Sequence, residues 1–519
     1  MEGNQVVVVD VINLNNMKKI IIPVVFLFSF VGFSQTSKDL NKNYTKRVLE
    51  NAEVDLISSF YSQDGDNAAV TGGIGTEKLT DIATNITVSI PLNANDVLTI
   101  DGTISAYTSA SSSNVNPFDG GGNTSNRFDY DDDDKGTISA KSAASTNVNT
   151  NNLGNSISNS SGGSPWVESS GASKSDVWAS GDIGYSHYSA DRNSIVGVHL
   201  NFANEFDYTS FGFGGSFTKL FNEKNTEIDL KGNVYFDSWQ PVYPTEIKAY
   251  KEANSNLNAG FFTGVDILNK NGTIINKNGP TVWSPFNTNL IDNKSRNTYS
   301  VSLSFFQILS KKAQVSLFLD LVKQDGWLAN PMQRVYFGDK ANYFIGNASS
   351  IPNYTSKSNT DVFQLADDIE RLPTTRFKIP VGARFNYYIN EAVSLRTYYR
   401  YYYDDWGITA HTANIELPIK ISDTFTLYPT YRYYTQTAAD YFAPYEENLS
   451  TSDYYTSDYD LSEFNSNQFG FGISYTDIFT SRRIWKLGLK SIDLKYSNYK
   501  RNTGLTAGIV NVGFKFVMD

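Results

Sequence analysis

The chain has 519 residues, no cysteine and a formal net charge of −11. The lack of cysteine excludes a disulfide framework, a thiolate metal centre and a lipid-anchored cysteine, and the negative charge argues against nucleic acid as a partner. Aromatic residues make up 14% of the chain, with 33 Tyr and 33 Phe, yet the mean hydropathy is only −0.35. An aromatic-rich but polar chain is typical of a membrane β-barrel, in which one face of each strand is apolar and the other is wet.

The first residues predict a targeting segment. Lys18 and Lys19 follow Met17, and an apolar run extends from Ile20 to Phe33. This pattern indicates a signal peptide at 17–34, which is too short for a lasting transmembrane helix. We therefore interpret 1–16 as an upstream extension, 35–52 as a short periplasmic segment, and 53–519 as the barrel.

Beyond residue 53, segments of alternating apolar and polar residues recur. In 313–321, for example, Val315, Leu317 and Leu319 oppose Gln314 and Ser316. A period of two specifies sheet rather than helix. We predict about sixteen strands, which start near residues 54, 82, 96, 175, 193, 207, 225, 297, 312, 374, 391, 407, 423, 465, 486 and 503.

The connections between these segments alternate in length. Short polar turns such as Asn93–Asn95 and Lys311-Lys312 alternate with long inserts. Outer-membrane barrels have short periplasmic turns and longer extracellular loops. The sequence therefore predicts an all-β fold, a transmembrane antiparallel up-and-down β-barrel in the cell outer membrane. Its long extracellular loops are expected at 111–174, 239–296, 325–372 and 439–464.

Charged residues on the non-lipid faces of the strands are sorted along the chain. Acidic residues prevail in the first half and basic residues in the second, so that opposite walls of the lumen would carry opposite charge. In a water-filled pore these charges would select or order polar solutes, whereas in a narrow barrel they would pair and fill the interior. The predicted lumen charges are Asp101, Asp182, Glu205, Asp229, Asp237, Arg376, Arg384, Arg396, Arg400 and Arg432.

The first long insert contains an acidic run, formed by Asp129, Asp131, Asp132, Asp133 and Asp134. Carboxylate oxygens at this density could hold Ca²⁺, although the spacing is not that of an EF-hand. A solvated acidic run is the simpler interpretation, and no other cofactor is expected.

Histidine chemistry gives little support for an enzyme. The best candidate is His411 near Asp404 and Asp405, but an interfacial histidine beside a tight turn explains the same residues. The sequence contains no phosphate loop, serine elbow or metal motif, so we expect no catalytic residues.

Several segments together resemble a family of uncharacterised outer-membrane β-barrel proteins of Bacteroidota and Proteobacteria, a domain of unknown function. They include 164–166, 205–208, 221–227, 371–373 and 399–407. The resemblance spans about 50–519. It implies outer-membrane location, no settled activity, and genomic neighbours that resemble flavin transferases and thioredoxins, which would indicate a redox or maturation context.

Two functional hypotheses follow. The first is a pore or binder for polar solutes with a charged lumen. The second is a non-enzymatic structural or accessory barrel in an outer-membrane complex or maturation pathway. The expected partners are outer-membrane lipid, the barrel-assembly machinery during insertion and other outer-membrane proteins.

Overall fold

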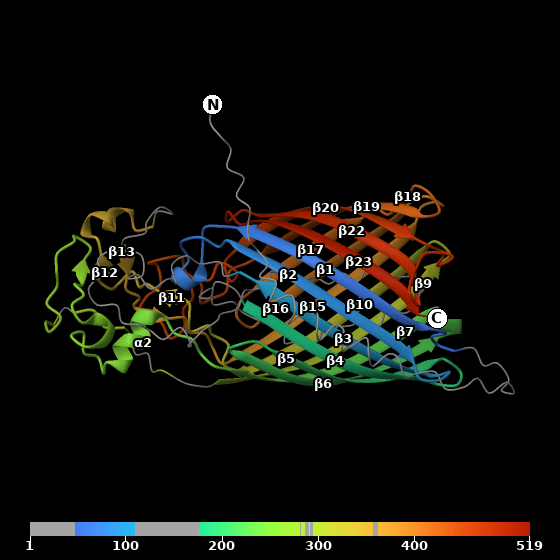
Figure 1. Ribbon diagram of the computed structural model, residues 1–519, viewed down its shortest axis with the longest axis horizontal. Coiled ribbons are helices and arrows are strands. Elements are labelled where there is room, and N and C mark those ends of the chain that lie inside the picture. Colours follow the sequence, from blue (N-terminus) through green and yellow to red (C-terminus); the bar gives the residue numbers. More distant parts are fainter. Residues whose placement is uncertain are drawn as a thin grey trace, which may run out of the picture. The chain divides into compact units, whose positions relative to one another are not determined.

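The computed structural model describes residues 47–108, 176–280, 282–285, 290, 294–355 and 362–518. The predicted upstream extension, signal peptide and acidic run lie outside these residues. Sixteen long strands form one antiparallel sheet that closes on itself (Figure 1). They are β1 (Ala52–Asp64), β2 (Leu79–Pro91), β3 (Asp96–Tyr107), β4 (Asp176–Tyr188), β5 (Ser194–Asn204), β6 (Tyr208–Phe221), β7 (Thr226–Trp239), β9 (Lys294–Ser310), β10 (Ala313–Gly326), β15 (Thr375–Tyr388), β16 (Ser394–Asp404), β17 (Thr409–Glu416), β19 (Phe425–Gln436), β20 (Phe464–Thr476), β22 (Leu487–Arg501) and β23 (Thr506–Met518).

The remaining elements are short and lie in the connections. The strands are β8 (Leu268–Asn269), β11 (Arg334–Val335), β12 (Tyr343–Gly346), β13 (Val362–Gln364), β14 (Asp368–Ile369), β18 (Ile419–Lys420) and β21 (Arg483–Ile484). The helices are α2 (Thr245–Glu252) and the 3-10 turns η2 (Ala69–Thr71), η4 (Asn222–Lys224), η5 (Gly260–Phe262) and η6 (Ala348–Asn353). No helix among the described residues is long and apolar enough to cross a membrane.

The barrel closes between its first and last strands. β1 pairs with β23 along its whole length, from Ala52 opposite Met518 to Asp64 opposite Thr506. Closure leaves no sheet edge unpaired, which is the condition for a sheet to lie in lipid. The predicted count of sixteen strands is confirmed, and each predicted start lies within a few residues of the observed one.

Alternation along each strand decides which face is exposed. In β5, Val196, Val198, Leu200 and Phe202 are about half exposed on the outside of the barrel, whereas Asn201 is buried on the inside. The pleat sends successive side chains to opposite faces, so this pattern places apolar groups outward and polar groups inward. It is the reverse of a soluble protein and the arrangement that a lipid surface requires.

The two ends of the barrel differ. At one end the strands are joined by turns such as 92–95, 222–225 and 311–312. At the other end lie long connections, as predicted, and they carry α2, β11, β12 and β13 (Figure 1). We call the first end the inner rim and the second the outer rim.

The long connections fold together into what we call the outer cap, formed by the described parts of 65–78, 240–285, 327–374 and 437–463. Val70 packs with Met332 and Val242, and Arg334 donates from Nη1 to the Val70 carbonyl at 2.9 Å. The loop that carries Val70 follows the first of the sixteen strands, and the loop that carries Met332 follows the ninth. These loops rise from opposite walls, so their contact spans the mouth of the barrel.

Candidate functional site

The inner face of the barrel holds nine of the ten predicted lumen charges. Each lies on the same face of its strand as buried or half-buried neighbours and opposite the exposed apolar residues. Glu205 follows the last residue of β5 at the outer rim, where it is buried. The nine are Asp101, Asp182, Asp229, Asp237, Arg376, Arg384, Arg396, Arg400 and Arg432.

Several of these charges are neutralised by a partner on a neighbouring strand. Arg376 Nε donates to Asp404 at 2.9 Å, and Arg396 Nη1 donates to Glu416 at 2.9 Å. Asp237 accepts from Arg296 Nε at 3.0 Å, and both side chains are almost fully buried. Asp229 instead has its partner on its own strand, since Lys231 of β7 lies 3.2 Å away. The interpretation that lumen charges pair and fill the interior therefore holds for this subset.

A second subset is basic and lies on β15, β16 and β19. Arg384 lies over the stacked rings of Phe318 and Tyr398, 5.6 Å from each centroid, and forms no ion pair with a described residue. Arg400 has a buried Nε without a hydrogen-bond partner among the described residues. The charge of Arg400 also acts on Arg432 and on the Asp320 carboxyl. We call Arg384, Arg400 and Arg432 the arginine cluster.

An acidic pair lies on the opposite wall. Asp101 of β3 and Asp182 of β4 are register partners. Asp101 accepts hydrogen bonds from Asn85 Nδ2 at 3.0 Å and from Thr87 Oγ1 at 2.6 Å, and no cation neutralises either carboxyl within the described residues. In the order of the sixteen strands, β3 and β4 are third and fourth, whereas β15, β16 and β19 are tenth, eleventh and thirteenth.

The acidic pair and the arginine cluster thus face each other across the lumen. Asp101, Asp182, Arg384 and Arg400 each lie within the middle part of their strands rather than at a rim. Opposed charges in a narrow aqueous space create a transverse field, which orders polar solutes and discriminates ions. The predicted opposition of acidic and basic walls stays a prediction, and these residues are the ones on which it depends.

A pocket lies at the outer rim beneath the cap. It is lined by Trp239, Trp327, Arg296 and Asp207 together with the apolar residues of 328–332. The Arg296 guanidinium lies 5.2 Å from the centroid of Trp239, and Lys294 lies 5.4 Å from that of Trp327. Both indole N–H groups are buried without a partner among the described residues. Buried donors of this kind are usually satisfied by water or by a polar ligand.

Glu205 lies close to this pocket, in the turn between β5 and β6. Both carboxyl oxygens are buried, and neither accepts a hydrogen bond from a described residue. Burial raises the pKa of Glu205 to about 9, and the nearby Asp207 carboxyl adds to this. The raised pKa favours the neutral form of this carboxyl at neutral pH, and the neutral form can donate a hydrogen bond.

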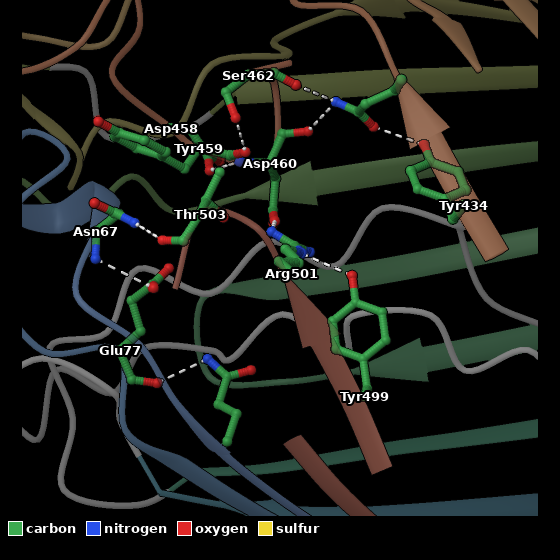
Figure 2. A network of polar contacts seen from close by, with 12 residues as sticks. Asn67, Glu77, Tyr434, Asp458, Tyr459, Asp460, Ser462, Tyr499, Arg501 and Thr503 are labelled. Atoms are coloured by element: carbon green, nitrogen blue, oxygen red, sulfur yellow. Dashed lines mark hydrogen bonds and ion pairs between the residues drawn. The ribbon is translucent and has the colours of Figure 1, made fainter. Parts of the chain in front are cut away.

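A network of polar contacts ties the outer rim to the cap (Figure 2). Arg501, the last residue of β22, is paired with Asp460 and donates from Nε to Tyr499 Oη at 2.8 Å. Asn67 donates from Nδ2 to the Thr503 carbonyl at 2.7 Å and from its backbone to Glu77 at 3.2 Å. Loops that follow β1, β19 and β22 are joined in this way, which fixes the cap on the barrel.

Among the described residues, the printed hydrogen-bond partner of His411 is a tyrosine and not a carboxylate. His411 lies on the outward face of β17, and its Nδ1 is 2.8 Å from Tyr399 Oη. Asp404 faces inward, where it accepts from Arg376 and from the backbone of Trp406 and Ile408. The interfacial interpretation of His411 describes this geometry. Within the described residues, no group of three or more His, Asp or Glu side chains could hold a metal ion.

Sequence reasoning missed three pocket residues, which are Arg296, Trp239 and Trp327. Arg296 and Trp239 continue the inward alternation of β9 and β7 to the outer rim. Extending each predicted strand by a few residues toward the outer rim would have placed both side chains in the lumen. Trp327 lies just beyond β10 in the cap, where no periodicity applies.

A family model described as a protein of unknown function (DUF3570) matches residues 21–508. Among curated proteins, no match to the sequence was found. Many solved structures match, including a bacterial polysaccharide outer membrane secretin (TM-score 0.38, 8% identity, covering 90% of this chain and 99% of that one).

Two further structures have comparable scores. One is a mutant of the ferric enterobactin receptor PfeA from Pseudomonas aeruginosa (TM-score 0.36, 12% identity), of which the match covers 54%, against 88% of this chain. The other is a BenF-like porin from Pseudomonas fluorescens Pf-5 (TM-score 0.35, 7% identity, covering 90% of this chain and 98% of that one). We draw no functional argument from similarities at this level.

Proposed function

We propose that this chain, which belongs to the DUF3570 family of unknown function, is an outer-membrane channel for polar solutes with selectivity from opposed lumen charges. The outward apolar faces supply the lipid contact, and strand number alone allows an aqueous interior, since barrels of 16–18 strands leave one. The observation that carries the proposal is the arginine cluster opposite Asp101 and Asp182.

Unneutralised charges support passage or binding more than packing. An inward charge that serves only to fill a barrel is expected to have a partner, because an unpaired charge in a dry interior costs several kcal/mol. Arg376, Arg396 and Asp237 follow that rule. Arg384, Arg400 and Asp182 form no ion pair with a described residue, and the only compensation of the two arginines comes at longer range from the Asp320 carboxyl among the described residues, which favours a hydrated middle of the lumen.

The test is ion selectivity of the full chain reconstituted in a planar bilayer, measured as the reversal potential in a salt gradient. A lumen charge acts on an ion 4 Å away by about 1 kcal/mol in water-like surroundings, or about fivefold in permeability. We expect the double variant Arg384→Gln/Arg400→Gln to shift selectivity toward cations and Asp101→Asn/Asp182→Asn to shift it toward anions.

Lys323→Gln is the matched control, because Lys323 lies on the outward face of β10 and its loss removes one positive charge outside the lumen. It should leave the reversal potential unchanged. The proposal is wrong if folded barrels conduct no ions both in the native form and after the cap has been loosened by Arg334→Ala. It is also wrong if the lumen variants and Lys323→Gln behave alike.

The outer cap favours a second candidate, an accessory barrel that acts through protein partners. A folded, loop-built surface above the mouth is what a receptor or assembly partner would present. Silence in the bilayer experiment would favour this candidate, and co-purification of native complexes from outer membranes would then test it.

A further inference from the structure

The turn between β20 and β22, residues 477–486, differs from every other described turn at the inner rim. Four large apolar side chains lie within eight residues, and all are exposed. Phe479 and Trp485 are 87% and 96% exposed, while Ile478 and Ile484 are each more than 60% exposed. We call this segment the inner-rim finger. Exposed apolar patches of this density mark an interaction site.

The finger is a built structure and not a loose loop. Asp477 is buried and accepts hydrogen bonds from Ser481 Oγ at 2.8 Å and from the Arg482 backbone at 3.1 Å. Within β21, Ile484 pairs with Leu487, and Trp485 then takes a positive φ of 58°. That conformation is uncommon for a non-glycine residue, and the indole that it carries is almost fully exposed.

Three cations lie among the apolar residues of the finger. Arg482, Arg483 and Lys486 are exposed. The one acid of the segment, Asp477, is buried and hydrogen-bonded within the segment. The finger therefore carries net positive charge. Nearby on the inner rim, Lys490 pairs with Glu53 at 2.7 Å and Lys420 with Asp423 at 2.8 Å.

Contacts to the barrel place the finger at its lipid-facing surface. The Arg482 guanidinium lies 5.5 Å from the ring centroid of Tyr475, and that ring packs against Phe425 at 5.3 Å. Tyr475 and Phe425 are register partners on the outward face at the inner ends of β20 and β19. Arg482 thus caps an aromatic pair at the level where the apolar belt ends.

We infer that the inner-rim finger inserts into the periplasmic leaflet, with its apolar side chains at the acyl boundary and its cations on lipid phosphates. Trp with Arg and Lys is the composition of membrane interfaces, and anionic headgroups attract such clusters of cations. The short turns mark this end as periplasmic. The inference rests on the membrane location included in the proposed function, but not on conduction through the lumen.

The test measures the surroundings of Trp485 in the full chain, reconstituted in phosphatidylcholine vesicles with phosphatidylglycerol. The chain has seven Trp, so the Trp485 signal is the difference between native protein and Trp485→Phe, a substitution that its exposure makes harmless to folding. We expect loss of this signal with lipids brominated near the carbonyl group and protection from aqueous acrylamide. Replacing Arg482, Arg483 and Lys486 by Gln should weaken both effects.

Insertion of the barrel is measured separately, by the heat-dependent change in electrophoretic mobility. If the barrel is inserted and the Trp485 signal is quenched by acrylamide but not by bromine, the inference is wrong, and a periplasmic protein becomes the expected occupant. If the barrel does not insert, the proposed membrane location has failed first and the inference fails with it.

Discussion

The outer cap and the barrel wall treat large apolar side chains in opposite ways. In the cap, Ile247, Phe262 and Tyr336 are fully buried, as in a soluble domain, and polar groups that are buried with them, such as Arg334 and Glu246, are paired. In the wall, Leu230 and Val301 are about half exposed on the outside, and the charges point inward. The cap therefore buries its large apolar side chains and the wall exposes them, because the cap is suited to face water and the wall to face lipid.

The cap depends on interactions that the wall does not need. A closed barrel satisfies its backbone through the sheet alone. The cap has little regular structure and is instead organised by buried ion pairs and ring contacts, such as Arg334 with Glu246 and Tyr336 with Tyr445. We therefore expect the two regions to respond differently to single substitutions.

The largest expected effect is that of Arg334→Ala. Arg334 donates from Nε and Nη2 to Glu246 at 2.7 and 3.1 Å, and both side chains are almost fully buried. Removing one partner leaves a buried charge and costs about 3–5 kcal/mol. Limited proteolysis should then cleave 240–285 and 327–355 rapidly, while the barrel keeps its heat-dependent mobility shift.

The control for this variant is Lys248→Ala. Lys248 lies on the same helix as Glu246 and forms an exposed ion pair with Glu252, at a distance of 3.9 Å. Exposed pairs contribute well under 1 kcal/mol, so the cleavage rate should not change. Loss of the mobility shift in Arg334→Ala would show that cap and wall fold as one unit, contrary to the comparison.

Gly407→Ala should have the next largest effect, because it acts where the wall meets the cap. Gly407 has a φ of +88°, and a Cβ there would collide with the Asp440 carboxylate. The same turn positions Trp406, which packs with Leu328 and Leu461 of the cap. We expect a loss of about 2–3 kcal/mol, measured by urea unfolding in lipid vesicles.

Gly504→Ala separates the cost of an unfavourable backbone φ from the cost of a steric collision, which Gly407→Ala combines. Gly504 has a φ of +99° in the turn between β22 and β23, but a Cβ there meets open space. It should cost only the conformational term, about 1 kcal/mol. Equal losses in the two variants would show that Asp440 moves aside and that the turn does not fix the cap.

The contrast between wall and cap also explains what the sequence could and could not predict. In the wall, period-two alternation predicts where the strands lie and which side chains of each strand point inward. Asp101, Arg384 and Arg400 could therefore be placed in the lumen from the sequence alone. The cap has no period. Its contacts, such as Arg334 with Val70, join residues 264 positions apart, and nothing local in either segment indicates the other. Local pairs such as Arg396 with Glu416 were equally hidden, because they depend on the register between strands.

Glu77 offers the smallest expected effect and tests the junction by pH. It lies at the outer rim just before β2, where burial raises its pKa from 4.5 to about 7, and hydrogen bonding from the Asn67 backbone only partly offsets this. A carboxyl whose pKa is higher in the folded state binds more protons there between pH 4.5 and 7. The contribution of Glu77 to the free energy of unfolding is therefore most favourable below pH 4.5 and falls as the pH rises through 7.

The upper bound for this fall is about 3 kcal/mol, at 1.36 kcal/mol per pKa unit, and we expect about 1–2 kcal/mol because water reaches the rim. In Glu77→Gln the fall between pH 5 and pH 8 should shrink by that amount, measured by urea unfolding in lipid vesicles. Glu223→Gln, which removes an exposed carboxylate from an inner turn, should leave the pH profile as it is. An unchanged profile in Glu77→Gln would mean that the rim is hydrated at Glu77 and that the cap is held there by Asn67 and Arg501 without a cost from the buried acid.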